Sequence, residues 1–200
     1  MKLTGFRPLR ADEIECRIGQ MTDKSLTILL YKDSRADMDL LDETVGPMNW
    51  KREHLRDNKN CVVSIWDEDK KEWVSKEDTG TESKSEAEKG LASDSFKRAC
   101  VNWGIGRELY TGPMIRLFAS KGHYEAVGNK TYDKFEVAAI ECDELKQITK
   151  LAIRNTTSGK IVFQWGFGDN QNEIIDGIKE SIDNAKKARA DIIEAIKEES

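Results

Sequence analysis

Two adjacent basic residues, Lys97 and Arg98, are the side chains whose types and spacing indicate the clearest chemistry in this chain. They fall in a segment with helical periodicity, and successive residues of a helix point about 100° apart. The two side chains therefore cannot share one partner group. They can straddle a groove and hold two successive phosphates. Taken alone, such a pair on a helix is more often a solvated surface feature than a binding site.

Residues that could support catalysis are sparse. The chain lacks the G-x-x-x-x-G-K-[ST] pattern of a P-loop, and neither His54 nor His123 has a second metal ligand at a useful spacing. Four carboxylates could serve a two-metal nuclease: Asp37, Asp39, Asp42 and Glu43. Their periodicity is that of the polar side of an amphipathic helix, which favours a solvated face. We therefore expect a binding protein and not an enzyme, with no cofactor and no metal.

The composition is that of a globular protein rich in surface charge, with 38% apolar and 34% charged residues. No apolar run approaches the length of about 20 residues that a membrane-spanning helix needs, and the N-terminus lacks the apolar core of a signal peptide. The four cysteines have no C-x-x-C spacing. We therefore expect the thiols to be reduced, the protein to be cytoplasmic and no membrane to be a partner.

The formal net charge of −5 is not spread evenly along the chain. Residues 170–200 hold eight acids and five bases, so they supply −3 of that total. Binding of a polyanion depends on the local potential and not on the total charge. The acidic balance therefore does not exclude a phosphate-binding face elsewhere.

Hydrophobic periodicity predicts the elements that position these residues. Helical spacing predicts helices over residues 9–18, 34–45 and 85–103. Short apolar or alternating runs separated by turn residues predict strands at 26–31, 50–55, 61–66, 73–75, 135–141, 147–154 and 160–165. The pattern indicates an α+β fold with a mostly antiparallel sheet.

The helix predicted over residues 85–103 has the best-defined apolar stripe. The stripe is about 100° wide and consists of Ala92, Phe96, Ala99, Cys100 and Trp103. Lys97 and Arg98 lie off it, toward solvent or a ligand. Trp103 belongs to it, which favours a core position over a stacking platform.

The C-terminal segment has a different character. Its apolar residues step three and four apart, with one Arg interruption, at Ile175, Ile178, Ile182, Ala185, Arg189, Ile192 and Ile196. A heptad seam of this kind forms a coiled coil. It is equally typical of a terminal helix docked on its own domain. We predict one domain over residues 1–169 and a helical tail over 170–200.

Three segments in this order resemble the phage single-strand annealing proteins of the Sak type, relatives of the eukaryotic Rad-fifty-two recombination mediators. They are residues 8–18, residues 31–50 and residues 73–110, the last containing Ser-Asp-Ser-Phe-Lys-Arg-Ala at 93–99. The resemblance covers residues 3–113 closely and 114–169 more loosely. It rests on the ordered set, because any one segment would be weak.

The resemblance implies a fold and a function. The expected fold is a β-β-β-α annealing core packed on a long helix, followed by further strands and a C-terminal helix. The expected function is ATP-independent binding and annealing of single-stranded DNA in homologous recombination, in a phage or prophage. Expected partners are single-stranded DNA, other copies of the chain in a ring or helical filament, and a single-strand binding protein through the tail.

The resemblance also implies DNA-binding residues. The basic pair at the end of the long helix corresponds to Lys97 and Arg98, and a further basic residue corresponds to Arg35 within one position. Trp103 stands where the family has an aromatic residue. Eukaryotic members have an Arg where this chain has Val101 and an aromatic where it has Pro47. Other cations are therefore expected to complete the groove: Lys51, Arg52 and Lys89.

Two alternatives to annealing follow from the same residues. A passive single-stranded DNA-binding module would coat a strand without pairing it. A metal-dependent nuclease would use the carboxylates between Asp37 and Glu43.

Arg35 lies near the start of a predicted helix, where the helix dipole disfavours a cation. We therefore expect it to have an anionic partner, either an acid or a phosphate.

Overall fold

The computed structural model describes residues 5–81, 87–168 and 171–198 and has an α+β fold, as predicted. The chain forms two compact units. Unit 1 combines residues 1–9 with residues 32–107. Unit 2 consists of the remaining residues, 10–31 and 108–200.

This division differs from the predicted one, which placed a single boundary between residues 169 and 170. The chain passes between the units after residues 9, 31 and 107, so a segment from early in the sequence belongs with the C-terminal half. A boundary of this kind leaves no change of composition in the sequence. The C-terminal helix is part of unit 2.

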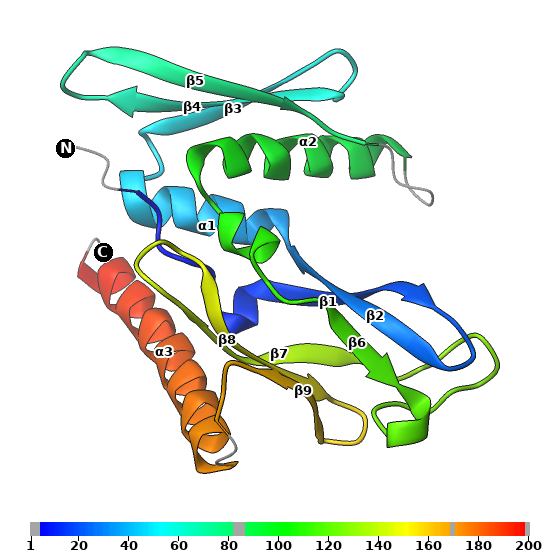
Figure 1. Ribbon diagram of the computed structural model, residues 1–200. Helices are drawn as coiled ribbons and strands as arrows, with labels where there is room; N and C mark the ends of the chain where they lie inside the picture. The colour runs from blue at the N-terminus through cyan, green and yellow to red at the C-terminus, as the bar shows by residue number, and fades with distance from the viewer. Residues whose placement is uncertain (1–4, 82–86, 169–170, 199–200) are drawn as a thin grey trace. The chain divides into compact units, whose positions relative to one another are not determined.

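Unit 1 is a three-stranded antiparallel sheet with two helices, and contains the predicted β-β-β-α order (Figure 1). Its strands are β3 (Trp50–Leu55), β4 (Asn60–Asp67) and β5 (Glu72–Thr79), with β4 in the centre. Helix α2 (Ala87–Trp103) packs against β4 and β5, and helix α1 (Ser34–Val45) packs against α2. The sheet thus has one face toward α2.

Helix α1 begins and ends where the sequence signals place its ends. The side chain of Asp33 accepts a hydrogen bond of 2.8 Å from the backbone N–H of Arg35, which makes Asp33 the N-cap. Gly46 follows the helix with a φ of 86°, a left-handed region that a residue with a side chain adopts only with strain. Pro47 then prevents the helix from continuing.

The core of unit 1 lies between α2 and the sheet. Phe96, Ala99 and Cys100 from the predicted apolar stripe are fully buried, as are Cys61 and Val63 of β4. The strand and the helix also meet closely at Gly80, where a Cβ atom would lie only 2.5 Å from the backbone nitrogen of Ser95. Only glycine permits this approach. The position of α2, and so of its basic pair, is fixed by this packing.

Unit 2 is built on a six-stranded sheet in the order β6-β2-β1-β7-β8-β9. The strands are β1 (Ile14–Met21), β2 (Ser25–Lys32), β6 (Ile115–Phe118), β7 (Phe135–Cys142), β8 (Ile148–Asn155) and β9 (Ile161–Trp165). The pairs β2–β6, β1–β7, β7–β8 and β8–β9 are antiparallel. Short 3-10 helices lie at Ala11–Glu13, Arg107–Tyr110 and Ala119–Lys121.

The helix predicted over residues 9–18 was wrong, because residues 14–18 belong to strand β1 and only the 3-10 turn Ala11–Glu13 is helical. Ile14 and Ile18 are four residues apart, and this spacing fits one face of a strand as well as one face of a helix. Cys16 between them completes a period of two that favours the strand. The hydrogen bonds with β7 decide the outcome, with Glu15 opposite Glu136.

The C-terminal helix α3 (Gln171–Glu198) packs on β7, which supports the docked alternative for its first turns. Ile178 packs against a cluster formed by Ala138, Ala139 and Ala152. Two other isoleucines of the helix remain largely open, Ile182 with 45% and Ile193 with 54% of its surface exposed. The side chains of Ile192 and Ile196, two members of the seam, lie outside the described residues.

Candidate nucleic-acid interface

Lys97 and Arg98 lie on α2 and reach different partners. Arg98 is exposed and forms an ion pair with Asp78 of β5, its Nη2 lying 3.2 Å from Oδ1. Lys97 is half-buried and interacts electrostatically with Asp37 of α1. The two cations therefore point to different sides of α2, Lys97 toward α1 and Arg98 toward β5.

A buried ion pair underlies the side of α2 that faces α1. The Nζ of Lys32 contacts Oδ1 of Asp37 and donates a hydrogen bond of 2.9 Å to the backbone carbonyl of Ile105. Both side chains are almost wholly buried. Gly106 has a φ of 74°, and a Cβ there would lie 2.9 Å from Cδ of Lys32. The Gly104–Gly106 turn thus ends α2 and also makes room for Lys32.

Burial raises the pKa of Asp37 from 3.8 to about 6. The loss of solvation is the dominant cause, and it outweighs the attraction of Lys32 and Lys97 and a hydrogen bond from Cys100. The Oδ2 atom of Asp37 has no hydrogen-bond partner among the described residues. Asp37 is therefore a structural acid that places negative charge beneath Lys97.

Arg52 lies on the same side of α2 as Lys97, and Arg35 lies on α1, the helix that packs on this side. Arg52, on β3, approaches α1 with Nη1 3.9 Å from the sulfur of Met38, and its guanidinium lies 4.8 Å from the centroid of the Phe96 ring. Arg35 is one helical turn before Met38, so both arginines flank this residue. We call Arg35, Arg52 and Lys97 the α1-side cations.

Arg35 has the acidic partner that its position on the helix predicts. Its Nη1 lies 3.6 Å from Oδ2 of Asp33, the residue that caps the helix. The Arg35 side chain is 82% exposed, so the pair is weak and open to exchange with another anion. The anionic partner of Arg35 in this chain is thus an acid, Asp33. The exposed guanidinium could also bind a phosphate.

A second group of cations, of which the sequence indicated only Arg98, lies on the β5 side of α2. Lys76 donates from Nζ to the backbone carbonyl of Asn102 at 2.8 Å, and Arg107 donates from Nη2 to the same oxygen at 2.8 Å. Both satisfy the free carbonyls of the last turn of α2 and complement its dipole. We call Lys76, Arg98 and Arg107 the β5-side cations. The last carbonyls of any helix lack partners within the helix, so the predicted end of this helix could have indicated that basic side chains bind there.

The remaining predicted site residues lie apart from the α1-side cations. Trp103 is half-buried, donates from Nε1 to the carbonyl of Val63 at 3.0 Å and is covered by Lys76, so it anchors α2 to the sheet. Lys51 is on the face of the sheet away from α2, where its Nζ lies 4.5 Å from the ring centroid of Trp73. The side chain of Lys89 lies outside the described residues.

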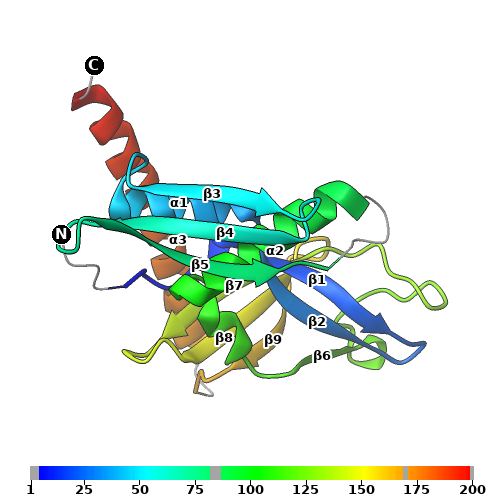
Figure 2. The ribbon, with the colours of Figure 1, turned by 90° about the horizontal axis from the view of Figure 1, so that it is seen from above.

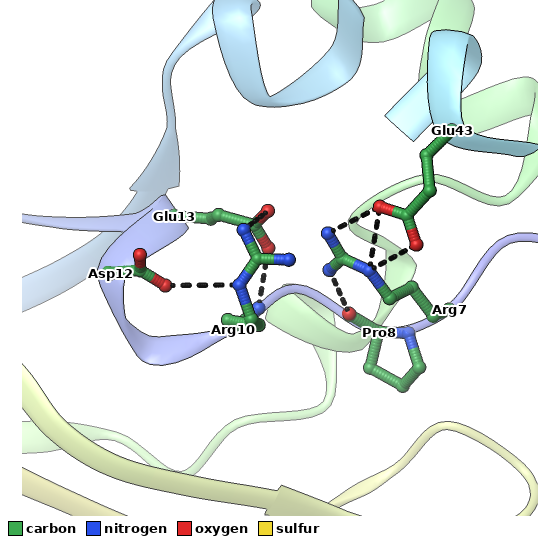
Figure 3. Close-up of polar contacts among 6 residues, drawn as sticks. All are labelled: Arg7, Pro8, Arg10, Asp12, Glu13 and Glu43. Atoms are coloured by element: carbon green, nitrogen blue, oxygen red, sulfur yellow. Dashed lines mark hydrogen bonds and ion pairs between the residues drawn. The ribbon is translucent and has the colours of Figure 1, made fainter. Parts of the chain in front are cut away.

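The carboxylates considered for a nuclease have separate roles. Asp37 is buried against Lys32, and Asp42 accepts a hydrogen bond of 2.6 Å from Nε1 of Trp50. Glu43 binds the guanidinium of Arg7, with Nη2 and Oε2 2.9 Å apart (Figure 3). In the part of the chain that the structure describes, no three His, Cys, Asp or Glu side chains are grouped as metal ligands.

Figure 3 also draws the ion pairs that join Arg10 to Asp12 and Glu13 within unit 2. These contacts and the pair of Arg7 with Glu43 use the cations of the N-terminal segment internally. Arg7 and Arg10 are therefore less suited to binding a phosphate than the exposed α1-side cations.

No protein-family model matches the chain, and neither curated proteins nor solved structures include a significant match to it. None of the helices in the described part of the chain has the length and apolar character that a membrane span requires.

Proposed function

We propose that the protein binds single-stranded DNA and anneals complementary strands without ATP, as a recombination protein of a phage or prophage. The observation that carries the proposal is the β-β-β-α order of unit 1, with Arg35, Arg52 and Lys97 on one side of α2. The resemblance to the Sak-type proteins implies this order and a basic pair at this place on the helix.

Binding in this proposal is electrostatic. Lys and Arg side chains contact backbone phosphates and release counterions, which gives an affinity that is independent of base sequence and falls with salt. Bases left free of the protein can then sample a second strand. Stacking of about 1.4 kcal/mol per base step in the product duplex drives the pairing, so no catalysed reaction and no cofactor are needed.

Self-association completes the proposal. Several copies in a ring or filament, each with a few phosphate contacts, bind one strand multivalently, and this explains how an acidic protein can bind DNA tightly. Light scattering should return a mass well above the 22.7 kDa of one chain. A monomer at micromolar concentration, with and without DNA, would contradict it. The tail from residue 170 is the proposed contact for a single-strand binding protein.

The test is a fluorescence annealing assay on two complementary oligonucleotides, with no nucleotide present. The annealing rate should rise well above the spontaneous rate. Tight binding without acceleration would identify a passive single-stranded DNA-binding module instead. Degradation of labelled DNA with magnesium or manganese, and its loss in the Asp42→Asn variant, would support the nuclease.

A further inference from the structure

The face of the three-stranded sheet away from α2 carries a pair of tryptophans. Trp66 of β4 and Trp73 of β5 are direct cross-strand partners, and their rings meet edge to face with centroids 5.5 Å apart. Trp73 is 38% exposed. Figure 2 looks onto this face, with β4 between β3 and β5 and α2 behind the sheet. Within unit 1 the two rings therefore form an open aromatic surface.

Polar neighbours hold the two rings in place. Trp66 donates from Nε1 to Oε2 of Glu68 at 2.7 Å, which fixes its polar edge. The small side chains of Ser64 and Ser75 are hydrogen-bonded to each other at 2.8 Å and take up little space beside the tryptophans. The exposed side chain of Lys51 rests its ammonium group over Trp73. The surface is thus preorganised, with one movable cation on it.

The charges near the tryptophans leave Lys51 able to bind an anion. In the β4–β5 turn, Lys70 pairs with Asp67 at 3.5 Å and Lys71 pairs with Glu68. Lys51 has no acidic partner among the described residues, and its ammonium group lies over the ring of Trp73 instead. Proteins bind single-stranded nucleic acid with basic side chains at the backbone and aromatic rings under the bases, and Lys51 and Trp73 supply one of each.

We propose that Trp73, supported by Trp66, stacks an unpaired base of single-stranded DNA while Lys51 binds the adjacent phosphate. The flexible side chain of Lys51 moves from the ring to the phosphate, and the base takes its place. This inference rests on the proposed function and adds a contact with bases to the phosphate contacts of the α1-side cations.

Two acids on the same face limit the site and argue against a second copy of the chain as its occupant. Glu53 and Glu77 are both exposed and flank Val62 on β4. Their carboxylates repel a phosphate backbone, so the site takes one or two bases at the tryptophan end of the sheet. The centre of a protein–protein interface is depleted of such charges.

The test compares an intact oligonucleotide with an abasic strand of the same length, which has the phosphates without the bases. The protein should bind the intact strand about tenfold more tightly, as stacking on one aromatic side chain allows. Trp73→Leu should remove most of this preference, so that the intact and the abasic strand bind with nearly equal affinity. Lys51→Ala should weaken binding of both strands. The matched control is Trp165→Leu, which alters a similarly exposed tryptophan of unit 2.

Three results would overturn the inference. The first is a Trp73→Leu variant that keeps the preference for the intact strand. The second is loss of self-association in this variant with the preference intact, which would make the face a contact between copies. The third, no binding of either strand by the parent protein, would reject the proposed function as well. Trp73→Phe, which retains an aromatic ring, should keep most of the preference and guards against a folding defect.

Discussion

The two sides of α2 use their cations differently. On the β5 side, Lys76 and Arg107 share the carbonyl of Asn102, and Arg98 is paired with Asp78, so each cation already has an acceptor in unit 1. On the α1 side, Arg52 rests on the ring of Phe96 and has no carboxylate at ion-pair distance among the described residues.

Arg35 and Lys97, the other two α1-side cations, each have an acid nearby, but neither acid forms a strong ion pair with its cation. The side chain of Asp33 is 42% exposed and lies 3.6 Å from Arg35, whereas Asp37 beneath Lys97 is buried and committed to Lys32. Acceptors nearby, and not the number of basic residues, thus decide which cations can bind a phosphate. We therefore expect the α1 side to dominate DNA binding.

The largest effect should come from the core on which both sides rest. Phe96→Ala removes a fully buried ring and should cost about 3–5 kcal/mol of unfolding free energy through the cavity it leaves. Denaturant unfolding measures the loss, and Phe96→Leu should cost less. A cost below about 1 kcal/mol for the alanine variant would show that α2 is not held by this core.

Removing one partner of the buried pair of the α1 side should cost far more stability than removing one partner of the exposed pair of the β5 side. Lys32→Met leaves Asp37 buried without its partner and should cost about 3–5 kcal/mol. The double variant Lys32→Met/Asp37→Leu should recover most of that loss, because an apolar pair needs no solvation. Asp78→Ala should cost about 0–1 kcal/mol. Denaturant unfolding that returned equal costs for the two sides would break the comparison.

The raised pKa of Asp37 makes the stability of unit 1 depend on pH. Between 3.8 and about 6 the folded chain binds the Asp37 proton more tightly than the unfolded chain. Stability should therefore fall as the pH rises through this window, by up to about 3 kcal/mol. Thermal unfolding across the window measures this contribution as the difference from Lys32→Met/Asp37→Leu, which lacks both groups. If the parent protein instead became more stable relative to the double variant as the pH rises, the assignment would be contradicted.

The smallest effect should be on DNA affinity through the acid of the β5 side. Asp78→Asn removes the carboxylate that competes with a phosphate for Arg98, so single-stranded DNA should bind a few-fold more tightly. Fluorescence anisotropy at several salt concentrations measures the change. The same substitution in an Arg98→Ala background should have little effect. Unchanged affinity in the first case would show that Arg98 does not reach the DNA.

Much of the fold could be predicted because its signals are local. Asp33, Gly46 and the apolar stripe of Phe96 each act within one or two turns of a helix. The predicted bounds of α1 and the predicted end of α2 agree with the described ones, whereas the predicted start of α2 at residue 85 lies outside the described residues. Strand β6 (Ile115–Phe118) was missed because four residues are too few to show a period. The division into two units depends on contacts between distant segments, which periodicity does not report.

The candidate site was predicted less completely, for a related reason. The sequence identifies Lys97 and Arg98 as neighbours, but their partners Asp37 and Asp78 lie 60 and 20 residues away along the chain. The role of Lys76 as a cap for α2 likewise depends on a strand-to-helix contact. Such pairings follow from tertiary packing and are not encoded in local spacing.

The most direct test of the proposed annealing site is the annealing rate of the double variant Lys97→Ala/Arg98→Ala. Both side chains lie off the buried stripe, so the melting temperature should change little. Binding should weaken for any base sequence, and the plot of log K against log salt should become shallower by about 0.7 for each phosphate that the variant no longer binds. We predict a large fall in the annealing rate of complementary strands. Annealing at the parent rate would show that the groove lies elsewhere.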